Sequence, residues 1–124
     1  SKAKIFVLGF AFKGQPVTSD VRGSTAVALV KKLQEAGFNN IYGLDPVARK
    51  EDIVIHGVRH VASIEKGFEK ADAVVVMNNH PLFAELDMRT LLLRASKPVL
   101  LYDTWALHDP EEIKKVKGVQ YKRL

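Results

Sequence analysis

The unbroken apolar run Ala73–Met77 (AVVVM) constrains the fold of this chain more than any other feature. A strand with one face in water alternates apolar and polar residues, whereas a continuous apolar run is typical of a central parallel strand covered on both faces. The segments Ala3–Leu8 and Pro98–Tyr102 also have the composition of buried strands, and they end at Gly9 and Asp103. We therefore expect a parallel sheet between layers of helices.

Segments with helical spacing alternate with these strands. Over Ser24–Ala36 apolar residues recur three and four positions apart, and Gly37 follows where a left-handed residue commonly ends a helix. Further helices are expected over Ser63–Lys70, Pro81–Phe83, Met88–Arg94 and Pro110–Val116, and further strands over Ile41–Leu44 and Val119–Tyr121. The segment Val47–Val61 is ambiguous and allows a short helix and a brief strand around Ile53–Ile55. This order predicts one domain, residues 1–124, with a Rossmann-like α/β/α fold of three layers, a mainly parallel sheet of about five strands and right-handed crossovers.

The composition excludes several classes of function. The chain has 124 residues and no cysteine, so disulfides, thiolate metal sites and a thiol nucleophile are excluded. We find neither an apolar run of the ~18 residues that span a bilayer nor a signal peptide, so we expect a cytoplasmic chain without a membrane partner. The formal charge of +5 favours an acidic partner. Nucleic acid is not the expected partner, because aromatic residues do not alternate with the basic ones along one face.

The loop after the first strand is the main candidate for a binding site. Parallel α/β sheets bind ligands beyond the carboxyl ends of their strands, and the loop from Gly9 to Arg22 is longer than the usual 2 to 6 residues of such connections. It is not a Walker A loop, because Gln15-Pro16 replaces the Lys-Ser/Thr pair. A G-x-G-x-x-G fingerprint is also lacking, so direct binding of NAD by this domain is not expected.

Several polar residues at this edge allow two interpretations each. Lys13 has two interpretations. It binds a diphosphate together with the unpaired amides at the start of the next helix, or it is an ordinary exposed lysine. Asp20 and Arg22 either brace the loop or contact a ligand. Asn78 and His80 either donate hydrogen bonds to a sugar or ribose or shape a turn. The four-residue spacing of His56 and His60 fits a metal site poorly because Gly57 interrupts any helix, so no metal is expected.

The loop also carries a recognisable pattern. Leu8-Gly9-x-x-Phe12-Lys13 followed by Thr18-Ser19-Asp20-x-Arg22-x-Ser24 resembles the motif that opens the C-terminal domain of UDP-glucose/GDP-mannose dehydrogenases. The resemblance continues, essentially to the end of the chain, through Glu35-Ala36-Gly37, Tyr42-x-x-Asp45-Pro46, Ala71–Val76 and Val99-x-x-x-Asp103.

This resemblance implies a domain that closes over the nucleotide end of a UDP- or GDP-sugar. In that family, NAD and a cysteine nucleophile oxidise the sugar C6 alcohol to a uronate, as in polysaccharide biosynthesis. Both belong to N-terminal domains of a homo-oligomeric parent, so this chain would bind no cofactor and would not catalyse alone. By position, Phe12, Lys13 and Arg22 are implied nucleotide-sugar contacts, and Asp20 and Ser24 are implied loop supports. No residue of this chain is implied to be catalytic.

Three departures from the family pattern stand out. Ser19 replaces an aspartate and Thr25 replaces a proline, and both changes are mild. Trp105 lies where the family commonly has an arginine that reaches the nucleotide. An indole cannot form bidentate hydrogen bonds to phosphate, but it can stack on a base or sugar, or it can simply pack. The alternative function is therefore a non-catalytic module for protein contact or regulation.

Overall fold

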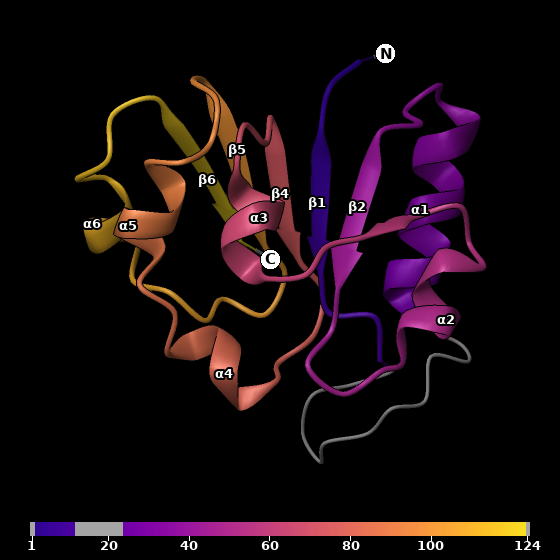
Figure 1. The fold of residues 1–124 in the computed structure, drawn as a ribbon. Helices are drawn as coiled ribbons and strands as arrows, with labels where there is room; N and C mark the ends of the chain where they lie inside the picture. Colours follow the sequence, from indigo (N-terminus) through magenta and orange to yellow (C-terminus); the bar gives the residue numbers. More distant parts are fainter. Residues whose placement is uncertain (1, 12–23, 124) are drawn as a thin grey trace.

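The computed structural model describes residues 2–11 and 24–123, and its elements alternate between strands and helices (Figure 1). The strands are β1 (Ile5–Leu8), β2 (Ile41–Leu44), β3 (Arg59–His60), β4 (Ala73–Val76), β5 (Val99–Asp103) and β6 (Val119–Arg123). The helices are α1 (Thr25–Glu35), α2 (Lys50–Val54), α3 (Ile64–Phe68), α4 (Pro81–Ala84), α5 (Met88–Leu92) and α6 (Pro110–Ile113). In this part of the chain no helix has the length and hydropathy required to traverse a bilayer.

The strands form one sheet in the order β3-β2-β1-β4-β5-β6. Every neighbouring pair is parallel, which confirms the predicted Rossmann-like α/β class, and the order is that of the dinucleotide-binding sheets. The sheet has six strands rather than about five. The strand expected around Ile53–Ile55 was wrong, because Ile53 belongs to α2 and is fully buried. The strand of this region is β3, only two residues long, after a turn at Gly57 with φ of +79°.

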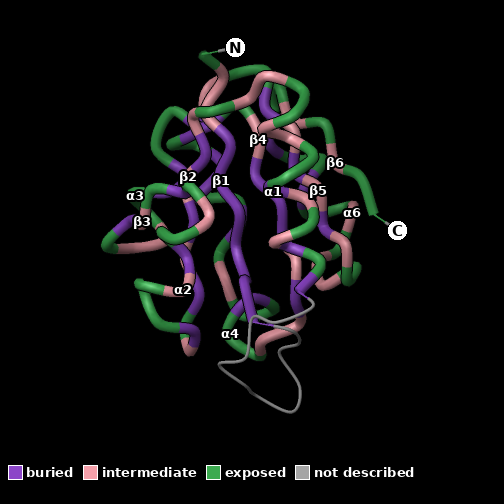
Figure 2. The backbone as a smooth tube through the Cα atoms, turned by 90° about the vertical axis from the view of Figure 1, so that its right-hand side faces the viewer, coloured by how far each residue is buried: buried purple, intermediate pink, exposed green. Residues whose placement is uncertain are grey.

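Two apolar clusters lie on the two faces of the sheet. On one face, Phe6 and Val74 pack against residues of α3, α4, α5 and α6. On the other face, Val7 and Val75 pack against α1 and α2. Figure 2 shows β1 as an almost continuously buried tube, while the helices and outer turns are largely half-buried or exposed. The alternation along β1 therefore sends successive side chains into opposite cores.

The helices cover the two faces unequally. Among the described residues, the second cluster draws helical residues only from α1 and α2, which follow β1 and β2. Right-handed crossovers place the helices between β4, β5 and β6 on the opposite face. As a result, Leu100 and Tyr102 of β5 stay half-buried on the α1 face. Half of that face is left without a helix of its own.

Helix α3 packs tightly on strand β1. The ring of Phe6 lies beneath this helix, with its edge toward the ring of Phe68 at a centroid distance of 5.7 Å. A Cβ atom added to Gly67 would come within 2.1 Å of Phe6 Cζ. The glycine therefore sets the distance at which α3 can pack on β1.

We expect Gly67→Ala to lower the free energy of unfolding by ~1–3 kcal/mol, because overpacking outweighs the higher helix propensity of alanine. Urea unfolding followed by circular dichroism measures this change. Gly37→Ala is the matched control: Gly37 has φ of +94° but no neighbour within 4 Å of an added Cβ, so only backbone strain of about 1 kcal/mol is expected. Equal losses for both variants would contradict the steric interpretation.

Candidate functional site

The strand order reverses between β1 and β4, and the candidate site lies at the carboxyl ends of these strands. After β1 the chain moves toward β2 and β3, and after β4 it moves toward β5 and β6. Leu8 and Val76 end the two central strands in register. The loops that follow them diverge to opposite sides, and such a switch point is where sheets of this class bind ligands.

A buried carboxylate organises this edge. Asp45, directly after β2, is 6% exposed, and its two oxygens accept five hydrogen bonds. Oδ2 accepts from the amides of Phe10 and Ala11 at 2.6 and 2.9 Å and from Asn78 Nδ2 at 3.2 Å. Oδ1 accepts from the amides of Val47 and Ala48, both at 2.8 Å. One side chain thus joins the segments that follow β1, β2 and β4.

These hydrogen bonds decide the charge of Asp45. Burial by itself raises the pKa of this carboxyl, but the amides of Ala11, Ala48, Val47 and Phe10 outweigh it and hold the pKa below its ordinary value. The group is therefore ionised at neutral pH. Its negative charge is balanced by backbone dipoles, and no ion pair to it is found in the described part of the chain.

Asn78 completes the same network from β4. It is 1% exposed, its Nδ2 also lies 3.4 Å from the carbonyl oxygen of Ala11, and its Oδ1 accepts from the amide of His80 at 3.1 Å. A Cβ atom on Gly9, where φ is +96°, would lie 2.7 Å from Asn78 Cγ. Gly9 is therefore required both for its left-handed backbone and for this contact.

Turn formation, and not a ligand, accounts for Asn78 and His80. The Nδ1 atom of His80 accepts from the amide of Leu82 at 3.2 Å and caps α4, where Pro81 begins the helix. Of the two interpretations that the sequence left open, the structure thus supports the turn. The side-chain amide of Asn78, which is occupied by these partners, is not free to bind a sugar.

The segment after β5 is held by a second buried carboxylate. Asp103 is fully buried, and its Oδ2 accepts from the amides of Leu107 and His108 and from the hydroxyl of Tyr121 at 2.7, 3.0 and 2.8 Å. Burial and the adjacent Asp103 raise the pKa of Tyr121 well above its usual range, so this hydroxyl remains a donor. The loop carrying Trp105 is consequently anchored at both ends.

Trp105 is fixed in orientation but open to solvent. Its Nε1 donates to the carbonyl oxygen of Met77 at 3.2 Å, while the preceding Thr104 donates from Oγ1 to the carbonyl oxygen of Val76 at 2.6 Å. Both bonds tie the loop after β5 to the end of β4. The indole remains 46% exposed.

Trp105 also lines an apolar groove beside α1. The groove has a volume of about 570 Å³. Its lining residues come from the start of α1, from β4 and β5 and from the residues after these strands: Thr25, Leu29, Val75, Met77, Tyr102, Thr104 and Trp105. It lies on the half of the α1 face that none of the helices in the described ranges covers, and it reaches the carboxyl ends of the strands.

The sequence-predicted contacts fall only partly within the described structure. Phe12, Lys13, Asp20 and Arg22 lie outside the described residues, so their roles stay predictions. Ser24 is buried and caps α1, its Oγ accepting from the amides of Ala26 and Val27 at 3.1 and 3.5 Å.

This cap changes one expectation about the helix start. Two amides of the first turn of α1 are already paired with Ser24 Oγ, whereas the sequence suggested a start whose amides are all open to a diphosphate.

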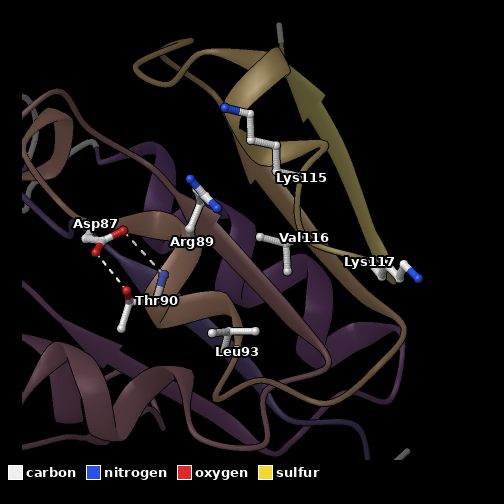
Figure 3. Close-up of a pocket in the computed structure, with 7 residues that line it drawn as sticks. All are labelled: Asp87, Arg89, Thr90, Leu93, Lys115, Val116 and Lys117. Atoms are coloured by element: carbon white, nitrogen blue, oxygen red, sulfur yellow. Dashed lines mark hydrogen bonds between the residues drawn. The ribbon is translucent and has the colours of Figure 1, made fainter.

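Another hollow, of about 610 Å³, lies between α5 and α6 on the opposite face of the sheet (Figure 3). Arg89 and Lys115 line it, but both also lie near Glu112, at 3.7 and 3.2 Å. Both oxygens of Asp87 accept hydrogen bonds from Thr90. The hollow is separate from the switch point. Its residues Val116 and Lys117 lie just before the amino end of β6, whereas the switch point lies at the carboxyl ends of β1 and β4. Within the described ranges, no group of three or more metal-ligating side chains gathers.

Sequence reasoning missed the roles of Tyr121 and of the groove residues. Tyr121 was expected only as part of an edge strand, and nothing in its neighbourhood in the sequence signals a contact with Asp103. Leu29 and Tyr102 were expected to be ordinary packing residues. Only the strand order shows which half of the sheet lacks a helix, so no local signal could have identified them.

The hydrogen bonds of Asp45 make stability depend on pH. Since its pKa is lowered in the folded state, this contribution is present above the unfolded pKa of about 3.9 and is lost as the pH falls through the folded pKa. Asp45→Asn should lower the free energy of unfolding at pH 7 by about 2–3 kcal/mol. It should also flatten the loss of stability that the unmodified chain shows between pH 5 and pH 3.

Urea unfolding at pH 3, 5 and 7 tests both expectations. Glu51→Gln removes an exposed carboxylate of α2 and serves as the control with an unchanged pH profile. An Asp45→Asn chain as stable at pH 7 as the unmodified one would contradict the role of this carboxylate.

Comparison with known proteins identifies the family. The family model described as "UDP-glucose/GDP-mannose dehydrogenase family, UDP binding domain" matches residues 6–110. The UDP-glucose 6-dehydrogenase of Rhizobium meliloti is 35% identical over 117 residues, which cover 91% of this chain and 25% of that protein. The UDP-glucose 6-dehydrogenase TuaD of Bacillus subtilis is 30% identical over 99 residues, which cover 78% of this chain and 21% of TuaD.

Solved structures agree with these relatives. The UDP-D-ManNAc dehydrogenase from Pyrococcus horikoshii superposes with a TM-score of 0.76 at 26% identity, covering 99% of this chain and 25% of that one. The chain thus spans about a quarter of the length of the relatives it matches. Because the family model covers most of the residues, including both central strands and the switch point between them, the chain belongs to the UDP-glucose/GDP-mannose dehydrogenase family, as its UDP binding domain.

Proposed function

We propose that this chain binds the nucleotide-diphosphate part of a nucleotide sugar. In the proposal it is the C-terminal domain of an NAD-dependent, cytoplasmic 6-dehydrogenase that oxidises the sugar C6 alcohol to a uronate. The observation that carries the proposal is the match to the UDP binding domain, whose motif begins at the carboxyl end of β1. There the motif borders a switch point, where sheets of this class bind ligands.

The diphosphate is the part of the ligand for which the chain offers most charge. Lys13, four positions after Gly9, supplies a cation that pairs with phosphate oxygens. Phe12 and Arg22 are proposed to contact the nucleotide sugar from the same loop, with Asp20 supporting the loop. Because Ser24 already occupies two amides of α1, we assign most of the attraction for the diphosphate to Lys13 and Arg22.

The described residues do not fit NAD. Dinucleotide-binding sheets of this order use an acidic residue to accept hydrogen bonds from a ribose hydroxyl. Asp45, which follows β2, is buried and already accepts five hydrogen bonds from protein groups. It therefore has no capacity left for a ribose. We assign NAD, which accepts the hydride in such oxidations, to the N-terminal domains of a longer parent.

Calorimetry with the 124-residue chain tests the proposed function. We expect UDP or GDP, and the corresponding nucleotide sugars, to bind, while NAD gives no heat of binding. Failure of all the nucleotide diphosphates and nucleotide sugars would contradict the proposal and favour a module for protein contact. Binding of NAD with comparable affinity would contradict the assignment of that cofactor to other domains.

Lys13→Ala should weaken the binding of UDP or GDP by ~1–3 kcal/mol, because a charge-assisted hydrogen bond to phosphate is lost. The same calorimetric titration measures the change. Lys117→Ala, which alters a lysine of the hollow between α5 and α6, is the control and should leave the affinity unchanged. An unaltered affinity of Lys13→Ala would remove this lysine from the site.

A further inference from the structure

The apolar groove beside α1 is placed to hold one end of a ligand that crosses the switch point. Thr25 begins α1, Met77 follows β4, and Thr104 and Trp105 follow β5. All four line the groove, so its end coincides with the carboxyl edge where the motif loop leaves β1. A ligand that lies across the switch point can extend in two directions, toward β2 or toward β5.

The direction toward β2 is closed by packed side chains. Phe10 is fully buried, and a Cβ atom on Gly43 of β2 would meet its ring at 2.5 Å. Asp45 lies beyond it, buried and with both oxygens occupied. The direction toward β5 opens into the groove, because none of the described helices lies above that half of the α1 face.

The groove suits a flat ring better than a sugar. Leu29, Val75, Met77 and Trp105 make the wall largely apolar, whereas a sugar requires partners for several hydroxyl groups. Among the lining residues, hydroxyl groups come from Thr25, Tyr102 and Thr104. Thr104 Oγ1 already donates its hydrogen atom to Val76. The indole of Trp105 is large and exposed, and its one N–H is used by Met77. What this side chain offers to a ligand is therefore its aromatic surface.

The orientation of Trp105 is set before any ligand arrives. The hydrogen bond to Met77 and the hydrogen bonds of the following residues Leu107 and His108 to Asp103 hold the loop in place. A preset ring loses little conformational freedom on binding, which favours affinity. Stacking on such a ring is also tolerant of the identity of the base, since every base has a π face.

We propose that the nucleobase of the bound nucleotide stacks on Trp105 in this groove. The inference rests on the proposed binding of a nucleotide diphosphate and adds which end of the ligand enters the groove. It also gives the tryptophan a role other than bidentate pairing with phosphate, namely stacking on the face of the base.

Trp105 is the single tryptophan of the sequence, so its fluorescence reports on the groove directly. Titration of the 124-residue chain with UDP should quench the emission and saturate at the calorimetric dissociation constant. Inorganic pyrophosphate should bind without quenching, because it has no ring. Trp105→Ala should lower the affinity of the chain for UDP about 5- to 150-fold and leave its affinity for pyrophosphate unchanged. Trp105→Phe, which keeps an aromatic face, should recover part of the loss.

A second pair of variants tests the groove without touching the tryptophan. Leu29→Gln places an amide in the wall of the groove. It should lower the affinity for UDP several-fold and leave the affinity for pyrophosphate unchanged. Leu93→Gln is the matched control, because Leu93 is 71% exposed in the hollow between α5 and α6. Circular dichroism confirms that each variant is folded.

The possible failures are distinguishable. If UDP binds in the calorimeter while the emission of Trp105 and the affinity of Trp105→Ala are unchanged, the stacking proposal is overturned and the proposed function stands. If Trp105→Ala lowers the affinity for pyrophosphate as much as the affinity for UDP, the residue only supports the loop and the stacking proposal is again overturned. If neither UDP, GDP nor their nucleotide sugars bind the unmodified chain, both proposals fail.

Discussion

The ionised carboxylate of Asp45 is the interaction on which the shape of the ligand-binding edge depends. Three segments that are distant in sequence leave the sheet at this edge, and each presents backbone amides or an amide side chain to the two oxygens of one residue. An aspartate whose pKa is lowered in this way stays ionised at neutral pH, and within the described residues its charge is met by hydrogen-bond donors. The buried charge thereby fixes the backbone at Phe10 and Ala11, directly after β1.

Asp103 has a corresponding role on the other side of the switch point. Asp45 follows the strand next to β1, and Asp103 ends the strand next to β4, so the two carboxylates flank the central pair of strands. Each collects the amides of the loop that follows it. The edge is consequently rigid on both sides of its centre. Such preorganisation allows a binding site to be built from loops without a large entropic cost on association.

The sequence predicted the elements that depend on local pattern and missed those that depend on tertiary contacts. The apolar runs around Val7, Val75 and Leu101 were correctly predicted as strands, and α1 was located to within a residue at each end. Helix α3 is shorter than expected because Lys70 adopts a left-handed conformation with φ of 56° and its amide bonds to Arg94. The groove could not be foreseen, since it exists only because right-handed crossovers leave part of one face uncovered.

The two outer strands determine how this sheet meets other chains. A parallel sheet that is not closed into a barrel has two free margins, each with unpaired backbone groups that another strand could recruit. Here one margin is β3, which is too short to template an added strand, and the other is β6, which ends in Lys122 and Arg123. The short length of β3 and the positive charge at the end of β6 therefore oppose the pairing of sheet edges between molecules.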